Sequence, residues 1–380
     1  MSKDKLSGLL ANYTDNLCLL MYLGINSLFI LKYGLRIVPL SFAMAACVFY
    51  AIFILVALNF FRWITERVSH TVLFSVMAVL LSVLVIVQVS IDPYQLRLDR
   101  WSAIHNFLHN LFRGIYPYAA QTHLGGYGSP FPVWQLFHIP FYLLGNVGLS
   151  FFCVVGLFVD SIRRVFGTRQ AMVAFLLLLS SPAFVYEVVT RSDLMTNFLL
   201  CSAIIFYMYH CRFSFRQHYV WISLVIGLMA STRLSAVIPF AVFFFSNYLK
   251  SGYRCQLLSA LIVVLVFALS FLPFLLWNGE MLLFFEYNPF VLQSRQGNLS
   301  DFLLFIPLGI WLAMTWRGDI NRYAMHTALL LVLLVVVTFV HNMYMNGNWD
   351  ALFQPSYDIT YFNMALPFLI LPLINKQTNV

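Results

Sequence analysis

Residues 71–91, TVLFSVMAVLLSVLVIVQVSI, contain no charged side chain and are followed at once by the polar stretch DPYQLRLDRWSAIHNFLHNLFRGIYPY, residues 92–118. A helix needs about 20 apolar residues to cross the hydrocarbon core of a bilayer. The first stretch is long enough, and Asp92 therefore marks the end of a membrane span. The polar stretch continues through a Gly-rich and Pro-rich run to Pro132, which predicts a large loop over residues 92–132.

The composition agrees with a membrane protein. The chain has 380 residues, of which 61% are hydrophobic and 9% are charged, whereas roughly a quarter of the residues in a soluble domain are charged. The net charge is +8, but the basic residues are scattered between apolar runs. We therefore predict an all-α, polytopic membrane protein that forms one multi-pass domain over residues 1–380, contacts membrane lipid and binds no nucleic acid.

About twelve spans are predicted from the apolar segments, near residues 15–31, 40–61, 71–91, 133–160, 170–189, 195–211, 218–231, 234–249, 256–277, 302–316, 323–342 and 359–375. Basic residues gather in every second connection: Lys3 and Lys5, Arg62 and Arg67, Arg163, Arg164 and Arg169, Arg212 and Arg216, Lys250 and Arg254, Arg317 and Arg322, and Lys376. Because short cytoplasmic loops are rich in Lys and Arg, we expect both termini in the cytoplasm and the 92–132 loop outside. Lys32 and Arg36 break this rule, which leaves the topology of the first two spans open.

An amphipathic helix is expected inside the loop. Trp101, Ile104, Leu108 and Leu111 recur at helical spacing, and a polar set recurs on another face: Ser102, His105, Asn106, His109 and Arg113. Gly114 is a suitable residue to end such a helix. Its bulky apolar face predicts that the helix lies flat on the outer membrane surface.

The loop carries two carboxylates with competing interpretations. Asp99 stands just before the helix, where it could cap the backbone N–H groups, pair with Arg97 or Arg100, or act in catalysis. Asp92 follows a span directly and is either a helix-end acid or a direct participant. Such a carboxylate in a loop can accept a proton from a reacting hydroxyl.

Two histidines in the loop, His105 and His109, are four residues apart and face the same side of the predicted helix. This spacing could begin a metal site, but no third ligand stands at motif spacing. We therefore interpret them as polar-face residues that bond solvent or substrate, and we expect neither a metal nor another cofactor.

Two short charged tips are predicted on the same side as the loop, one near Arg191 and Asp193 and one at Arg233. Arg191 and Asp193 could pair with each other or contact substrate. An Arg flanked by apolar helices at membrane depth is costly and typically marks an anion or ion pathway. We therefore expect Arg233 to contact a lipid-linked phosphate. Arg295, in a polar segment, is a weaker candidate of the same kind.

Asp99, the amphipathic helix and the turn Gly114-Ile115-Tyr116-Pro117-Tyr118 together resemble the first outer loop of the GT-C membrane glycosyltransferases, in the bacterial branch that uses polyprenyl-phosphate sugars. The tips Thr-Arg-Ser-Asp and Ser-Thr-Arg-Leu are similar to later outer turns of that family, and the resemblance covers residues 71–250. Two spans precede the family's usual first span. Asp99 also lies several residues beyond the membrane edge, while Asp92 lies nearer to it. This difference leaves open which of the two is the base.

The resemblance implies an inverting glycosyltransferase with an extracytoplasmic active site, in a bacterial inner or plasma membrane. The donor is a polyprenyl-phosphate sugar and the acceptor a glycan or lipid, as in the synthesis of cell-envelope polysaccharides. Asp99 is the expected base, Arg233 grips the donor phosphate with help from Arg191, and Tyr118 is expected to contact substrate. The alternatives are a transporter or flippase of a lipid-linked saccharide and a structural membrane protein without chemistry.

Overall fold

The computed structural model describes residues 3–284, 286–294, 299–349, 353 and 357–375. In these ranges the chain is helical, and the only β-type pairing is an isolated bridge between Gln121 and Tyr127. The prediction of an all-α protein is confirmed.

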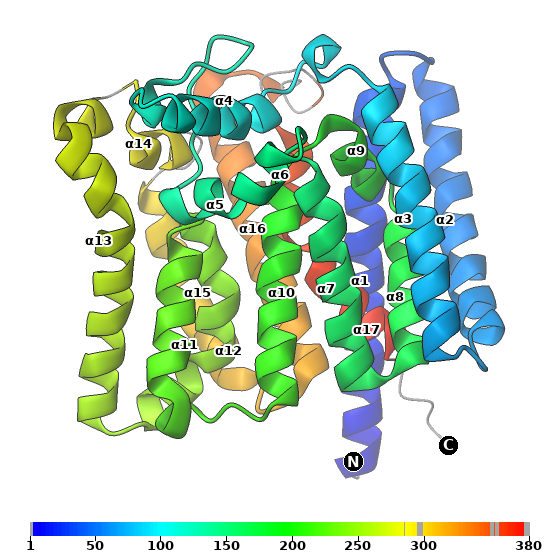
Figure 1. Cartoon of the computed structure of the whole chain (residues 1–380). Coiled ribbons are helices and arrows are strands. Elements are labelled where there is room, and N and C mark those ends of the chain that lie inside the picture. Colours follow the sequence, from blue (N-terminus) through cyan, green and yellow to red (C-terminus); the bar gives the residue numbers. More distant parts are fainter. Residues whose placement is uncertain (1–2, 285, 295–298, 350–352, 354–356, 376–380) are drawn as a thin grey trace.

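Most helices stand side by side in a bundle, and α4 lies across one end of it (Figure 1). The first half of the chain contains α1 (Lys3–Gly34), α2 (Leu40–Ile64), α3 (His70–Ser90), α4 (Arg100–Phe112), α5 (Pro132–Phe137), α6 (Ile139–Leu143), α7 (Leu149–Phe166), α8 (Thr168–Leu179) and α9 (Pro182–Thr190). The second half contains α10 (Leu194–His210), α11 (Phe215–Ala230), α12 (Val237–Lys250), α13 (Tyr253–Leu283), α14 (Pro289–Ser294), α15 (Leu299–Thr315), α16 (Ile320–Asn346) and α17 (Leu366–Ile374). Short 3₁₀ turns are η1 (Pro93–Gln95), η2 (Pro117–Ala119), η3 (Leu234–Ala236) and η5 (Ile359–Met364).

Several helices are suited to a lipid environment. Among the described residues, five helices are long and apolar enough to cross a membrane: α1, α2, α3, α13 and α16. The pair α8 and α9 is bent by 70° and makes a sixth if it is one span. These helices support an integral membrane protein in contact with lipid. Each of the twelve predicted segments overlaps a helix, but α10, α12 and α15 are shorter, so the count of about twelve spans is not confirmed.

The basic connections lie together at one end of the bundle. The turns that join α2 to α3, α7 to α8, α10 to α11 and α12 to α13 are all at the end opposite to α4 (Figure 1). Arg67 and Arg212 lie in these turns, and Arg164 and Lys250 lie in the last turns of α7 and α12 beside them; Lys376 lies outside the described residues. The basic residues that alternate along the sequence thus gather at one end of the bundle. That this end faces the cytoplasm remains a prediction.

The amphipathic helix forms as predicted, but its apolar face meets protein instead of lipid. Trp101, Ile104, Phe107 and Leu108 are buried in a cluster with aromatic residues of the loop and of neighbouring helices: Tyr116, Tyr118, Phe131, Trp134, Phe271 and Phe274. The expectation that α4 lies on the membrane surface is therefore corrected. Hydrophobic periodicity identifies the buried face of a helix but not what covers it.

A cavity where the loop meets the bundle

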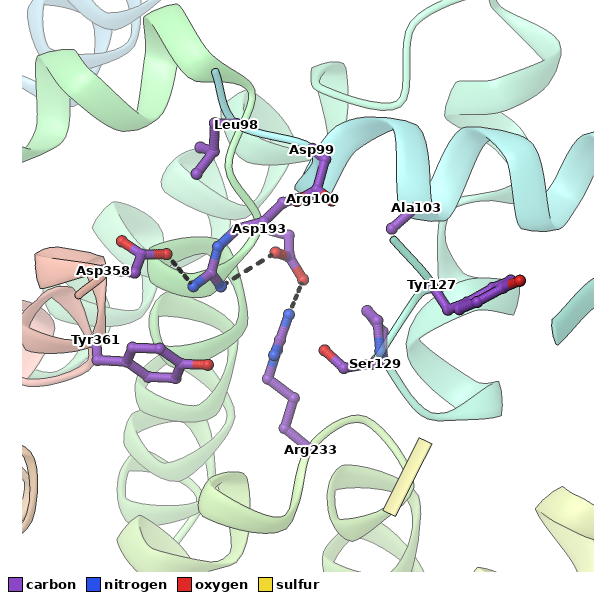
Figure 2. A pocket seen from close by; sticks show the side chains of 11 residues that line it. Leu98, Asp99, Arg100, Ala103, Tyr127, Ser129, Asp193, Arg233, Asp358 and Tyr361 are labelled. Atoms are coloured by element: carbon purple, nitrogen blue, oxygen red, sulfur yellow. Dashed lines mark hydrogen bonds and ion pairs between the residues drawn. The ribbon is translucent and has the colours of Figure 1, made fainter. Parts of the chain in front are cut away.

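A cavity of about 160 Å³ opens where α4 begins, and eleven residues from distant parts of the chain line it (Figure 2). They come from the start of α4, the return segment of the loop, the turns before α10 and η3, and the region of η5: Leu98, Asp99, Arg100, Ala103, Tyr127, Ser129, Pro130, Asp193, Arg233, Asp358 and Tyr361. Three of the predicted site residues, Asp99, Asp193 and Arg233, are thus brought to one cavity.

Asp99 is the residue that precedes α4, and neither structural interpretation of it holds. Its side chain makes no cap hydrogen bond to the helix. Its Oδ2 instead accepts a hydrogen bond from Thr122 Oγ1 at 2.8 Å. Within the described residues Asp99 forms no ion pair, so Arg97 and Arg100 do not neutralise it. The carboxylate therefore stays available at the cavity wall.

The Gly-rich return segment of the loop, which contains Gly126, packs against the Asp99 carboxylate. A Cβ added to Gly126 would lie 3.3 Å from Asp99 Oδ2 and 3.6 Å from Thr122 Oγ1. The backbone N–H of Gly126 also donates to Thr122 Oγ1 at 3.1 Å. A side chain at this position would therefore require the Asp99 carboxylate to shift by a few tenths of an ångström.

Arg100 points away from Asp99 and into a different set of contacts (Figure 2). Its Nη2 lies 2.6 Å from Asp358 Oδ2, its Nη1 lies 3.8 Å from Asp193 Oδ1, and its guanidinium carbon lies 5.2 Å from the centre of the Tyr361 ring. Burial disfavours the charged guanidinium, but the two carboxylates outweigh burial and raise the pKa of Arg100 above its ordinary value. Burial also opposes ionisation of Asp358, and the charge of Arg100 outweighs it, so the pKa of Asp358 is lowered.

Asp193 pairs with Arg233 across the two charged tips. Arg233 Nη2 donates to Asp193 Oδ2 at 2.5 Å, and Trp134 Nε1 donates to the same oxygen at 2.7 Å. The exposed fractions of the two charged side chains are 3% and 6%. Burial works against the Asp193 carboxylate, but Arg233 and Arg100 outweigh it and lower its pKa. Buried charges are tolerated only when paired in this way.

Arg191 is not the partner of Asp193. It ends α9 in the left-handed conformation, with φ of 51°, and its guanidinium donates to the backbone carbonyls of Gln88 and Ile91 at 3.0 and 3.2 Å. Gln88 lies in the last turn of α3 and Ile91 is its C-cap residue, so Arg191 binds carbonyls at a helix end, where the helix itself supplies few partners. Arg191 thus links the C-terminal end of α9 to the C-terminal end of α3. It does not line the cavity.

Other predicted site residues also lie elsewhere. Asp92 is exposed and accepts a hydrogen bond from Tyr94 N at 3.0 Å, which caps η1. Tyr118 is 2% exposed and packs against Phe107 and Phe274 in the cluster beneath α4. Arg295 lies outside the described residues. Of the two loop carboxylates, the cavity therefore contains only Asp99.

His105 and His109 stack with ring centres 6.3 Å apart, on a side of α4 that faces α6. His109 Nδ1 lies 3.2 Å from Tyr142 Oη. Burial and the neighbouring His109 lower the pKa of His105. Within the described residues no cluster of three His, Cys, Asp or Glu side chains could hold a metal ion. The pair does not line the cavity.

Several lining residues were not predicted from sequence: Arg100, Tyr127, Ser129, Asp358 and Tyr361. The sequence suggests for Arg100 only a role as an ion-pair partner of Asp99. Asp358 is 258 residues from Arg100 in the chain, and no motif relates the two. Tyr127 and Ser129 lie in the Gly-rich return segment, which was interpreted only as a connection.

The cavity has two chemically different parts (Figure 2). The ion-paired half consists of Arg100, Asp193, Arg233 and Asp358, whereas the loop half consists of Asp99, Ala103, Tyr127, Ser129 and Pro130. One half can therefore stabilise negative charge with held guanidiniums, and the other can accept a proton on a carboxylate. No protein-family model, curated protein or solved structure matches the chain.

Proposed function

We propose that the protein is an inverting glycosyltransferase that moves a sugar from a polyprenyl-phosphate donor to an acceptor hydroxyl on the extracytoplasmic face. The observation that carries this proposal is the convergence of Asp99, Asp193 and Arg233 on one cavity, at the same end of the bundle as the 92–132 loop. The resemblance to GT-C enzymes, noted in the sequence, implies that Asp99 and Arg233 act in the same reaction.

Asp99 is the base in this reaction. The acceptor oxygen attacks the anomeric carbon of the donor sugar while its proton passes to the Asp99 carboxylate. The new bond joins the acceptor oxygen to that carbon, the bond from the carbon to the phosphate oxygen breaks, and the lipid phosphate leaves with the electron pair. A single displacement of this kind inverts the anomeric centre. The absence of an ion pair at Asp99, among the described residues, suits a group that must take up a proton.

Arg233 and Arg100 stabilise the charge that grows on the leaving phosphate. A guanidinium has five N–H donors; Arg233 uses Nη2 for Asp193, while its buried Nε has no hydrogen-bond partner among the described residues. Asp193 and Asp358 hold the two arginines in position before substrate arrives, and such preorganised groups typically contribute roughly a hundred- to a thousand-fold in rate. The expected helper, Arg191, is bound to the end of α3, so Arg100 takes that role in the proposal.

The size of the cavity limits what it holds. Pockets for drug-sized ligands typically measure about 300–1,000 Å³, and this cavity is about 160 Å³. It is therefore too small for the lipid chain of the donor. Apolar helices that suit a bilayer form the rest of the bundle, and the donor lipid is expected to stay on that side.

Turnover of a labelled donor tests the proposal. The purified protein in lipid vesicles should consume a radiolabelled polyprenyl-phosphate sugar and release the lipid phosphate when a saccharide acceptor is present. A transporter or flippase would move the donor across the vesicle membrane without consuming it. Such movement without turnover would contradict the proposal, and vesicles without protein serve as the control.

A further inference from the structure

We infer that the loop half of the cavity takes an uncharged saccharide as the acceptor, and that Tyr127 contacts this saccharide at the rim. The inference rests on the proposed function and names its acceptor class. It follows from the charges around Asp99, from the surroundings of Tyr127 and from the size of the cavity.

The first argument is electrostatic. Of the charged residues that line the cavity, Asp99, Asp193 and Asp358 are acids, and Arg100 and Arg233 are bases. Both guanidiniums are engaged by Asp193 and Asp358, so the remaining negative charge is on Asp99. A carboxylate or phosphate on the acceptor would approach this charge at close range, and like charges in a partly buried site repel strongly.

Basic residues near the loop half do not offset this charge. Arg97 is exposed and does not line the cavity, and Arg100 turns toward Asp358 (Figure 2). Glu286, an exposed acid directly before Tyr287, does not line the cavity either. An uncharged hydroxyl-bearing acceptor is the class of ligand that this arrangement favours.

The second argument concerns Tyr127. It lines the cavity, and Figure 2 shows its ring extending outward from the loop half, away from the ion pairs. The ring is held edge-on against Tyr287, with centres 4.6 Å apart, and Gln121 Nε2 donates to its hydroxyl at 3.1 Å. An aromatic ring held at a cavity mouth offers an apolar face to the C–H groups of a sugar ring.

The third argument is the fit of one sugar ring. The cavity of about 160 Å³ leaves room beside Asp99 for a single ring of the acceptor. Ser129 lines the same half and carries a hydroxyl that can donate to or accept from a sugar hydroxyl. The reacting hydroxyl then faces Asp99, which takes its proton.

Binding of matched glycosides tests the charge argument without requiring turnover. The probes are the methyl glycosides of glucose and galactose and the corresponding uronates, titrated calorimetrically into the full-length protein in detergent. At least one neutral glycoside should bind on the order of tenfold or more tighter than its uronate, and Asp99→Asn should shrink that difference. Equal or tighter binding of the uronates, or binding of no neutral glycoside, overturns the inference.

Acceptor kinetics test the role of Tyr127. Tyr127→Ala should raise the acceptor KM about tenfold while kcat changes little, because the stacking face for the sugar ring is lost, and Tyr127→Phe should restore the wild-type KM. Tyr94→Ala is the matched control, since Tyr94 is an exposed loop tyrosine that packs on Trp101 and does not line the cavity.

The two proposals fail in different ways. Donor turnover that is faster with uronate acceptors, or an unchanged acceptor KM in Tyr127→Ala, overturns the acceptor class and leaves the transferase proposal standing. If neutral glycosides bind in a way that depends on Asp99 but no donor is turned over, the saccharide site is supported and the transferase proposal is contradicted.

Discussion

Asp99 and Arg100 are adjacent in sequence, yet they serve the two opposite halves of the cavity. The Asp99 carboxylate is held by the hydroxyl of Thr122, and the Arg100 guanidinium reaches Asp358 and Asp193. The start of α4 separates them, because Asp99 precedes the helix with non-helical backbone angles whereas Arg100 is its first residue. Two adjacent residues thereby supply both the proposed base and one of the proposed phosphate contacts.

At the scale of residues, the sequence indicates which single charged residues are candidates for the site, but not which of them form ion pairs. Asp99 could be selected because it is a loop carboxylate just before an amphipathic helix, and Asp193 and Arg233 because they are charges at short tips between apolar helices. The pairing of Arg233 with Asp193, and of Arg100 with Asp358, joins residues far apart in the chain. Local patterns carry no information on such contacts, and for the same reason Arg191 was misplaced as a substrate contact.

The Arg100–Asp358 pair predicts a pH dependence of stability. The pKa of Asp358 is lowered in the folded protein, so its contribution is present above the ordinary Asp pKa of about 3.9 and is lost as the pH falls through the folded value. Asp358→Asn should lower the free energy of unfolding by about 1.5–3 kcal/mol at neutral pH. Unfolding followed by circular dichroism in detergent should show this difference shrinking below about pH 4. A difference that grows toward acid pH would contradict the assigned pair.

At the scale of elements, α4 is the part that positions the site. Its length and apolar face could be read from the spacing of Trp101, Ile104 and Leu108, and its end at Phe112 agrees with Gly114 as a terminator. What covers the apolar face could not be read, because aromatic protein surface and lipid favour the same residues. The cluster beneath α4 fixes the helix, and with it Asp99, to the end of the bundle.

This packing predicts that substitutions on the two faces of α4 destabilise the protein by different amounts. Leu108 is fully buried, whereas Phe112 is 52% exposed. Leu108→Ala should therefore destabilise the protein by about 2–5 kcal/mol, and Phe112→Ala, which loses only a stacking contact with Tyr142, by about 0.5–1.5 kcal/mol. Thermal unfolding of the two variants in the same detergent measures the contrast. If both variants unfolded like the wild type, α4 would not be packed on the bundle as described.

At the scale of the whole molecule, the basic residues and the helix directions agree. The connections that contain or adjoin Arg67, Arg164, Arg212 and Lys250 lie at the end opposite to α4 (Figure 1), as the distribution of basic residues predicts. The number of spans was harder to predict, since α10, α12 and α15 are short and α8 and α9 bend by 70°. Apolar segments packed inside a bundle resemble spans in sequence without having to cross the bilayer.

The orientation can be measured by side-selective labelling. In a background with the six native cysteines replaced by alanine, single cysteines are placed at Arg97 and at Arg67, in connections at opposite ends of the bundle. A membrane-impermeant thiol reagent added to intact cells should label Arg97→Cys, and Arg67→Cys only after the membrane is opened. Labelling of both from the same side would contradict the predicted topology.

The central claim is that Asp99 is the base of a glycosyl transfer, and the most direct test compares the two loop carboxylates. Rates of sugar transfer from the labelled donor are measured for Asp99→Asn and Asp92→Asn in the same vesicles, with folding checked by circular dichroism. Asp99→Asn should lose roughly a hundred-fold or more of the rate, and Asp92→Asn, which is exposed and caps η1 outside the cavity, should stay near the wild-type rate. Wild-type transfer by Asp99→Asn, or its loss in Asp92→Asn alone, would contradict the account.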